Sequence, residues 1–201
     1  MVGLLIRHGH AEPVGHWLAG RRAGVLLDAA GREQASELVR ALTWLPLAAV
    51  YTSPLERAVE TAQPLANDHG LDVRVRPALT DIDFGEWTGR TLDELSNDPQ
   101  WANFNNQRAT GCPPGGEALA DVQRRVVQEL MTLARSHQGE TIAIITHAEP
   151  IRCALAAFTG QTLDEVLGVE ISPARVSAVG ITHSGVREVL DVNIPALEVT
   201  V

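Results

Sequence analysis

Two arginines and two histidines of this chain lie at the ends of apolar segments or close behind them. Arg7 and His8 directly follow one apolar run, His147 follows another, and Arg57 lies about one helical turn after a third. An arginine guanidinium offers paired donors to phosphate oxygens, and a neutral imidazole nitrogen can attack phosphorus to form a covalent intermediate. These residue types therefore predict recognition of a phosphoryl group, with a carboxyl group needed nearby to protonate a leaving alcohol.

The elements that must bring these side chains together are short buried strands. Apolar runs alternate with segments of helical periodicity, which is typical of a layered α/β fold. Three fully buried strands are expected, over Val2 to Ile6, Leu47 to Thr52 and Thr141 to Thr146. Because ligands bind at the carboxyl ends of the strands in open parallel sheets, we expect the two arginines and two histidines to meet there.

The remaining pattern predicts helices between these strands and an insertion. The run Ser53-Pro54-Leu55-Glu56 predicts a helix start with Ser53 as its N-cap, and this helix should continue to Asp68. The other predicted elements are helices from Gly31 to Thr43 and from Glu117 to His137, a short strand from Val73 to Val75, and a closing hairpin of Val176 to Ile181 and Val186 to Val192 around His183-Ser184-Gly185. We interpret the irregular segment of about residues 90–116 as a short cap insertion.

Bulk properties restrict the class of protein. The chain has 201 residues, of which 45% are hydrophobic and 20% charged, as expected of one globular domain over residues 1–201. The net charge of -9 argues against a nucleic-acid-binding surface. The two cysteines, Cys112 and Cys153, are far apart and imply neither a disulfide framework nor a metal site. No apolar stretch approaches transmembrane length, so we expect a cytoplasmic protein without membrane contact.

Five segments resemble, in order along the chain, those of the histidine phosphatase superfamily, also called phosphoglycerate mutase-like. They are Leu5-Ile6-Arg7-His8-Gly9, Tyr51-Thr52-Ser53-Pro54-Leu55-Glu56-Arg57-Ala58-Val59-Glu60-Thr61-Ala62, Asp83-Phe84-Gly85-Glu86-Trp87-Thr88-Gly89, Pro114-Gly115-Gly116-Glu117 and Ile145-Thr146-His147-Ala148-Glu149-Pro150-Ile151-Arg152. A lone Arg-His-Gly would be a weak signal, whereas five ordered segments are specific. The resemblance implies a three-layer α/β/α sandwich with a mostly parallel central sheet.

The resemblance also implies catalytic roles. His8 would accept the phosphoryl group, while Arg7, Arg57 and His147 would bind it and stabilise the transition state. The family usually carries its proton donor as a glutamate, and the corresponding position in this chain is Asp81.

Other residues near these segments are candidates for further roles. Glu86 is the alternative to Asp81 as the proton donor. Ala148 stands where the family often has glycine, and its backbone N–H stays available to the substrate. Arg21 and Arg22 lie in the loop after the first strand, where one of them could reach a second charge of the substrate or simply be exposed.

The resemblance favours a phosphatase over the other activities of the family. The segment around Phe84 is similar to small phosphatases such as α-ribazole phosphatase, and the cap is shorter than that of the mutases. We therefore expect metal-independent hydrolysis of a phosphomonoester through a phosphohistidine, without a cofactor, on a small phosphorylated metabolite. Family habit suggests a homodimer. If neutral His8 attacks, activity should fall at low pH, and a flat profile down to about pH 5 would argue against this role.

Three alternatives stay open from the sequence. A phosphoglycerate mutase-type phosphotransferase would return the phosphoryl group instead of losing it to water. A non-catalytic protein would only bind a phosphorylated ligand, although such a protein would not need both His8 and an acid. A metal-dependent hydrolase would use His8 and His10 as ligands, which the neighbouring arginines disfavour because they repel a cation.

Overall fold

The computed structural model describes residues 1–12, 15–182, 184–185 and 187–200. A six-stranded sheet with the strand order β3-β2-β4-β1-β5-β6 forms its centre. The strands are β1 (Val2–Arg7), β2 (Leu47–Thr52), β3 (Val73–Val75), β4 (Thr141–Thr146), β5 (Val176–Ile181) and β6 (Arg187–Ile194). Strands β1 to β4 pair in parallel, whereas β5 and β6 are antiparallel to their neighbours. The sheet is therefore mostly parallel, as the resemblance implies.

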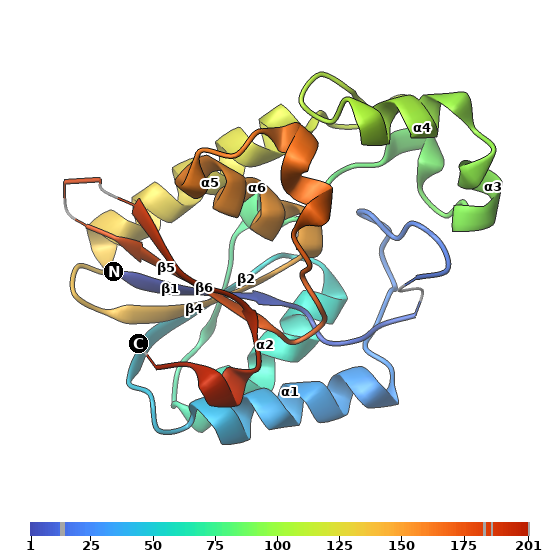
Figure 1. The fold of residues 1–201 in the computed structure, drawn as a ribbon. Coiled ribbons are helices and arrows are strands. Elements are labelled where there is room, and N and C mark those ends of the chain that lie inside the picture. The colour runs from blue at the N-terminus through green and yellow to red at the C-terminus, as the bar shows by residue number, and fades with distance from the viewer. Residues whose placement is uncertain (13–14, 183, 186, 201) are drawn as a thin grey trace.

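Helices cover both faces of the sheet, as Figure 1 shows. One face packs against α1 (Ala29–Leu42) and α2 (Glu56–Asp68), and the other against α5 (Leu119–Ser136) and α6 (Ala148–Thr159). Strand β1 shows the alternation: Leu4 and Ile6 belong to the core under α1 and α2, whereas Leu5 belongs to the core under α5 and α6. The predicted three-layer α/β/α sandwich is thus confirmed.

The predicted cap segment folds into two short helices beyond the carboxyl end of the sheet, α3 (Leu92–Ser96) and α4 (Pro99–Asn106). A Thr91–Glu94 capping box starts α3. The rings of Trp87, Trp101 and Phe104 pack together, with Trp87 and Trp101 edge-to-face at 5.3 Å. These aromatic side chains therefore hold the cap segment to the body of the protein.

Strand bounds were predicted more accurately than helix starts. Strands β2, β3, β4 and β5 match their predicted ranges, and β1 extends one residue further. Helix α1 begins two residues early because the Asp28 carboxylate accepts a hydrogen bond from Gly31 N and caps it. Helix α5 is shorter at both ends than predicted. Strand β6 runs to Ile194, and two residues of the predicted hairpin, His183 and Val186, lie outside the described residues.

The predicted cap of α2 is wrong. The helix begins at Glu56 after Leu55, which makes no side-chain capping bond. Ser53 still follows the strand path, because its backbone N–H donates to the carbonyl of Ile145 on β4. Its hydroxyl accepts a long hydrogen bond from Leu55 N at 3.3 Å and lies closer, at 2.7 Å, to His147 Nε2. The residue chosen as a helix cap therefore contacts the candidate site.

Candidate active site

The carboxyl ends of β1, β2 and β4 open into a cavity of about 190 Å³. Its floor is formed by Arg7, His8, Arg57, Asp81 and His147. The first two end β1, Arg57 lies in the first turn of α2, and His147 is the N-cap of α6. Parallel pairing of β1 with β4 and of β2 with β4 sets these elements side by side, so residues distant in sequence share one floor.

His8 is held with one ring nitrogen free to attack. It is buried, and its Nδ1 lies 2.7 Å from the carbonyl oxygen of Gly9, which can only accept; Nδ1 therefore carries the proton. The lone pair of Nε2 faces the cavity floor, where Arg57 Nε donates to it at 3.2 Å. Burial lowers the pKa of His8 well below its ordinary value, and the cations Arg57 and Arg7 lower it further.

The lowered pKa of His8 changes one expectation from the sequence. A histidine with an ordinary pKa would lose its nucleophilic form as the pH fell below about 6.5. His8 instead stays neutral to lower pH because of its burial and its two arginine neighbours. The expected fall of activity as His8 becomes protonated should therefore begin at a lower pH than it would for an ordinary histidine.

Three buried nitrogen atoms of the floor lack a hydrogen-bond partner among the described residues. They are Arg7 Nε, Arg57 Nη1 and His147 Nδ1. Neighbouring donors of the two arginines are occupied: Arg7 Nη1 binds the carbonyl of Ile171 at 2.6 Å, and Arg57 Nη2 binds that of Gly20 at 2.8 Å. Buried donors without partners are costly. A tetrahedral oxyanion placed among them would satisfy all three.

Asp81 has the environment of a proton donor. Its Oδ2 lies 3.3 Å from Arg57 Nη2 and 3.7 Å from His147 Nδ1. Burial raises its pKa to about 6, against the opposing effects of Arg57 and of the Ile82 backbone N–H. The carboxyl group is thus largely protonated below about pH 6, close to the place where a phosphate ester oxygen would lie.

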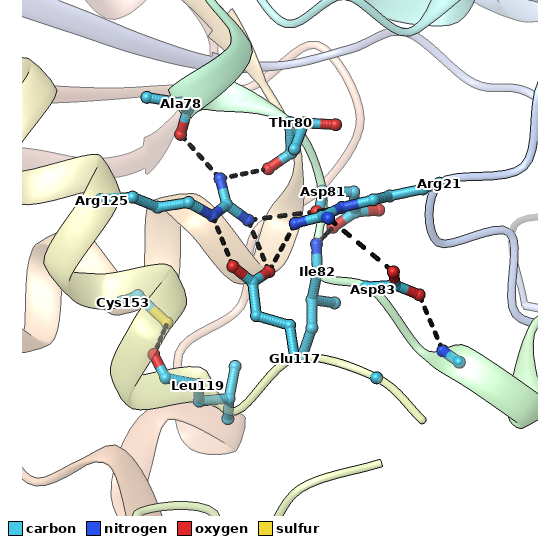
Figure 2. Close-up of polar contacts among 12 residues, drawn as sticks. Arg21, Ala78, Thr80, Asp81, Ile82, Asp83, Glu117, Leu119, Arg125 and Cys153 are labelled. Atoms are coloured by element: carbon cyan, nitrogen blue, oxygen red, sulfur yellow. Dashed lines mark hydrogen bonds and ion pairs between the residues drawn. The ribbon is translucent and has the colours of Figure 1, made fainter. Parts of the chain in front are cut away.

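Arg125 fixes the chain segment that carries Asp81. Figure 2 shows its guanidinium between this segment and Glu117. Nη1 donates to the carbonyls of Ala78 at 2.6 Å and Thr80 at 2.8 Å, while Nη2 donates to that of Asp81 at 3.1 Å. The carboxylate of Glu117 accepts from Nε at 2.9 Å and from Nη2 at 3.0 Å. One half-buried arginine therefore anchors the segment to α5.

The structure places the other sequence candidates differently. Arg21 does not belong to the described residues that line the cavity; it binds Glu117 at 2.7 Å and the carbonyl of Asp81 at 2.9 Å (Figure 2). Its predicted contact with the substrate therefore has no support from the geometry. Glu86 is exposed and away from the floor. Ala148 does line the cavity, at the first residue of α6.

The predicted alternative of a metal site formed by His8 and His10 can be compared with the structure. His10 Nδ1 pairs with the carboxylate of Asp28, and His10 does not line the cavity as described. Within the described part of the chain, no three His, Cys, Asp or Glu side chains gather as metal ligands.

None of the helices described is long and apolar enough to cross a membrane.

Sequence reasoning missed two residues near the floor. Glu149 lines the cavity, and Arg108 of the cap segment reaches it with Nη2 at 2.9 Å from Oε2. Arg108 is almost fully buried at 2% exposure. Only that burial marks Arg108 as special, and nothing in the local sequence signals it, because its partner lies far away along the chain.

Comparisons with known proteins agree with this geometry. The chain is 34% identical over 154 residues to the bifunctional protein Rv2228c of Mycobacterium tuberculosis, a match that covers 76% of this chain but only 42% of that protein. It is 29% identical over 178 residues to phosphoserine phosphatase 1 of Hydrogenobacter thermophilus, covering 81% and 78% of the two chains. The crystal structure of a putative alpha-ribazole-5'-P phosphatase from Escherichia coli superposes with a TM-score of 0.87 at 25% identity, over 100% of this chain and 99% of that one.

A family model extends the match to nearly the whole chain. The model of the histidine phosphatase superfamily (branch 1) matches residues 4–194. That range contains every floor residue of the cavity, from Arg7 to His147. The chain therefore belongs to the histidine phosphatase superfamily.

Proposed function

We propose that this protein hydrolyses small phosphomonoesters without a metal, through a phosphohistidine at His8. The single observation that carries the proposal is the floor of the cavity. There a neutral, buried imidazole lies among three unpartnered donors and beside a carboxyl group whose pKa is raised to about 6. Names of relatives support hydrolysis, since they include phosphoserine and alpha-ribazole phosphatases. One domain over residues 1–201 would carry the activity.

In the first step the substrate phosphate displaces Arg57 from the lone pair of His8 Nε2 and takes up the unpartnered donors. Nε2 attacks phosphorus in line, a new P–N bond forms, and the P–O bond to the alcohol breaks. The proton of the Asp81 carboxyl passes to the leaving oxygen, so the alcohol departs neutral. Arg7, Arg57 and His147 hold the charge on the transferring oxygens.

In the second step the Asp81 carboxylate accepts a proton from a water molecule whose oxygen attacks the phosphohistidine. The P–N bond breaks, its electron pair returns to His8 Nε2, and inorganic phosphate leaves. Asp81 is protonated again and the cycle closes. The same carboxyl group serves as acid and then as base, which a pKa of about 6 permits near neutral pH.

The decisive experiment is hydrolysis of p-nitrophenyl phosphate in excess EDTA by the wild type and by His8→Ala. We expect activity that survives the chelator and falls at least about a thousandfold in the variant, since the nucleophile is lost. His16→Ala is the matched control, because His16 is exposed and does not line the cavity described. Loss of wild-type activity in EDTA would contradict the proposal.

A substrate with a labelled phosphoryl group would distinguish hydrolysis from transfer. The label should first appear on His8 as an alkali-stable phosphohistidine, and its destination after that identifies the reaction. Labelled phosphate appears in water if the protein is a phosphatase, whereas a phosphoglycerate mutase-type phosphotransferase would hand the label to a second alcohol. The homodimer and the cytoplasmic location stay predictions from the sequence.

A further inference from the structure

Above its charged floor, the cavity has an apolar wall. Its members include Trp17, Leu18, Val25, Phe84, Leu92 and Ala148. They come from the loop after β1, from the segment before the cap helices, from the first residue of α3 and from the start of α6. Whatever is esterified to the phosphate must lie against these side chains, because the floor donors are taken by the phosphoryl group itself.

Backbone hydrogen bonds join the two main parts of this wall before any substrate binds. Leu18 N donates to the carbonyl of Arg90 at 3.0 Å, and Gly89 N donates back to that of Leu18 at 2.8 Å. Leu92 N donates to the carbonyl of His16 at 2.9 Å. The loop after β1 and the start of the cap segment thus form one continuous surface, so the apolar wall is preformed.

Glu149 is the one ionisable side chain of the wall as described. Cations hold both of its oxygens: Arg152 Nη1 lies 3.0 Å from Oε1, and Arg108 Nη2 lies 2.9 Å from Oε2. Both arginines are absent from the lining of the cavity described. Glu149 therefore neutralises part of the positive charge that Arg108 and Arg152 place beside the cavity.

The two arginines in the loop after β1, Arg21 and Arg22, bind other protein groups and do not point into the cavity as described. Arg21 pairs with Glu117, and the guanidinium of Arg22 lies over the ring of Trp17 at 5.0 Å. Neither guanidinium lines the cavity in the part of the chain that is described. A carboxylate on the substrate would therefore meet no arginine among the described residues of the wall.

We propose that this site selects phosphomonoesters whose alcohol part is apolar and carries no carboxylate, and that Glu149 determines this selectivity. The inference rests on the proposed phosphatase activity and deepens it. It separates this chain from proteins that bind carboxylated phosphoesters such as phosphoserine and 3-phosphoglycerate. Glu149 acts by pairing with Arg108 and Arg152, which would otherwise attract a second anion, while the apolar wall covers the leaving group.

Relative kcat/KM values for 1-naphthyl phosphate, phosphoserine and 3-phosphoglycerate test the proposal. In the wild type, 1-naphthyl phosphate should be preferred at least about tenfold, because ring burial favours it and charge disfavours the others. Equal or better use of the carboxylated esters would overturn the proposal. Failure to hydrolyse any of the three, or hydrolysis that survives His8→Ala, would instead refute the proposed function.

Glu149→Gln isolates the charge of the wall, because the amide keeps an oxygen for its arginine partners. The ratio of kcat/KM for 3-phosphoglycerate to that for methyl phosphate should rise about tenfold in this variant. Both esters have alkyl leaving groups, so any effect of Glu149 on the pKa of Asp81 acts on both alike and cancels in the ratio. Glu188→Gln on β6 removes an exposed charge far from the site and is the matched control. An unchanged ratio would overturn the role of Glu149.

Leu92→Ala tests the apolar wall at a position that is 36% exposed, where folding is little affected. The preference for 1-naphthyl over methyl phosphate should fall about threefold to tenfold, because the naphthyl ring loses apolar contact that methyl phosphate is too small to make. Leu190→Ala on β6, at 41% exposure, removes the same atoms away from the cavity and should leave the preference unchanged. If the preference for 1-naphthyl over methyl phosphate is the same in both variants, the apolar wall does not bind the leaving group and the proposal is overturned.

Discussion

Replacement of Arg125 by methionine should misplace the proton donor while leaving the nucleophile intact. The guanidinium of Arg125 donates to the carbonyls of Ala78, Thr80 and Asp81, and no floor contact of His8 involves it. Methionine keeps much of the length of the side chain but offers no donor. The segment that carries Asp81 would therefore lose its anchor to α5 and shift against the phosphate site.

The size of the effect follows from these contacts. Three charged-donor hydrogen bonds to carbonyls are lost, which should cost about 3–5 kcal/mol of unfolding free energy. A proton donor displaced by about 1 Å loses about a hundredfold in rate, within the hundredfold to ten-thousandfold that general acid catalysis supplies. This loss should appear with methyl phosphate, whose alkoxide must be protonated, and nearly vanish with 2,4-dinitrophenyl phosphate.

The assay is the ratio of kcat/KM values for the two leaving groups, measured well below the melting temperature of the variant. These values report phosphoryl transfer to His8 and exclude the later hydrolysis, in which Asp81 acts on both substrates alike. Arg124→Met is a close control, since Arg124 is adjacent on α5 and exposed, and pairs only with Asp121 among the contacts described. It should leave the ratio unchanged. An equal fall of both substrates in Arg125→Met would show a general loss of structure and refute the positioning argument.

Three further outcomes follow from the floor of the cavity. Because Asp81 donates a proton and its pKa is raised to about 6, kcat/KM for methyl phosphate should fall as the pH rises beyond about 6, whereas 2,4-dinitrophenyl phosphate should not show this fall. The pKa of Asp81 is about 6 in the folded protein and 3.8 in an ordinary aspartate, so ionisation of Asp81 destabilises the fold as the pH rises from about 4 to 6. Asp81→Asn removes this ionisation. In urea unfolding the variant should therefore be more stable than the wild type by up to about 3 kcal/mol at pH 8, but by little near pH 4. Inorganic phosphate at about a hundred times its Kd should add about 2.7 kcal/mol of stability, and Arg57→Met should abolish this gain.

The sequence predicted the frame of the site because buried strands have a local signature. The run Thr141–Thr146 is apolar throughout and ends at a polar histidine, so both the strand and its exit were visible in the chain. Parallel order then required His147, His8 and Arg57 to share one edge of the sheet. This step needs only the rule that crossover connections align the carboxyl ends of parallel strands.

Partners of buried polar groups had no such signature. Ser53 had the local pattern of a helix cap, yet its hydroxyl contacts His147, 94 residues away. Arg125 finds the carbonyl of Asp81 across 44 residues, and Arg108 finds Glu149 through folding of the cap segment. Which partner each of these side chains contacts depends on which polar groups the folded protein shields from water. No local sequence pattern determines this set of shielded groups.

Burial of polar groups without partners makes the floor of the cavity reactive, and it also makes the protein costly to fold. Arg57 and His147 are each 1% exposed, and each keeps a nitrogen without a partner among the described residues. Asp81 is held where its charged form is disfavoured. Packing of α2, α5 and α6 on the sheet must offset these terms, because nothing at the floor does so before substrate binds. Donors fixed in this way need no reorganisation when charge develops on the transferring oxygens, so a change that satisfied them within the protein would raise stability and lower kcat together.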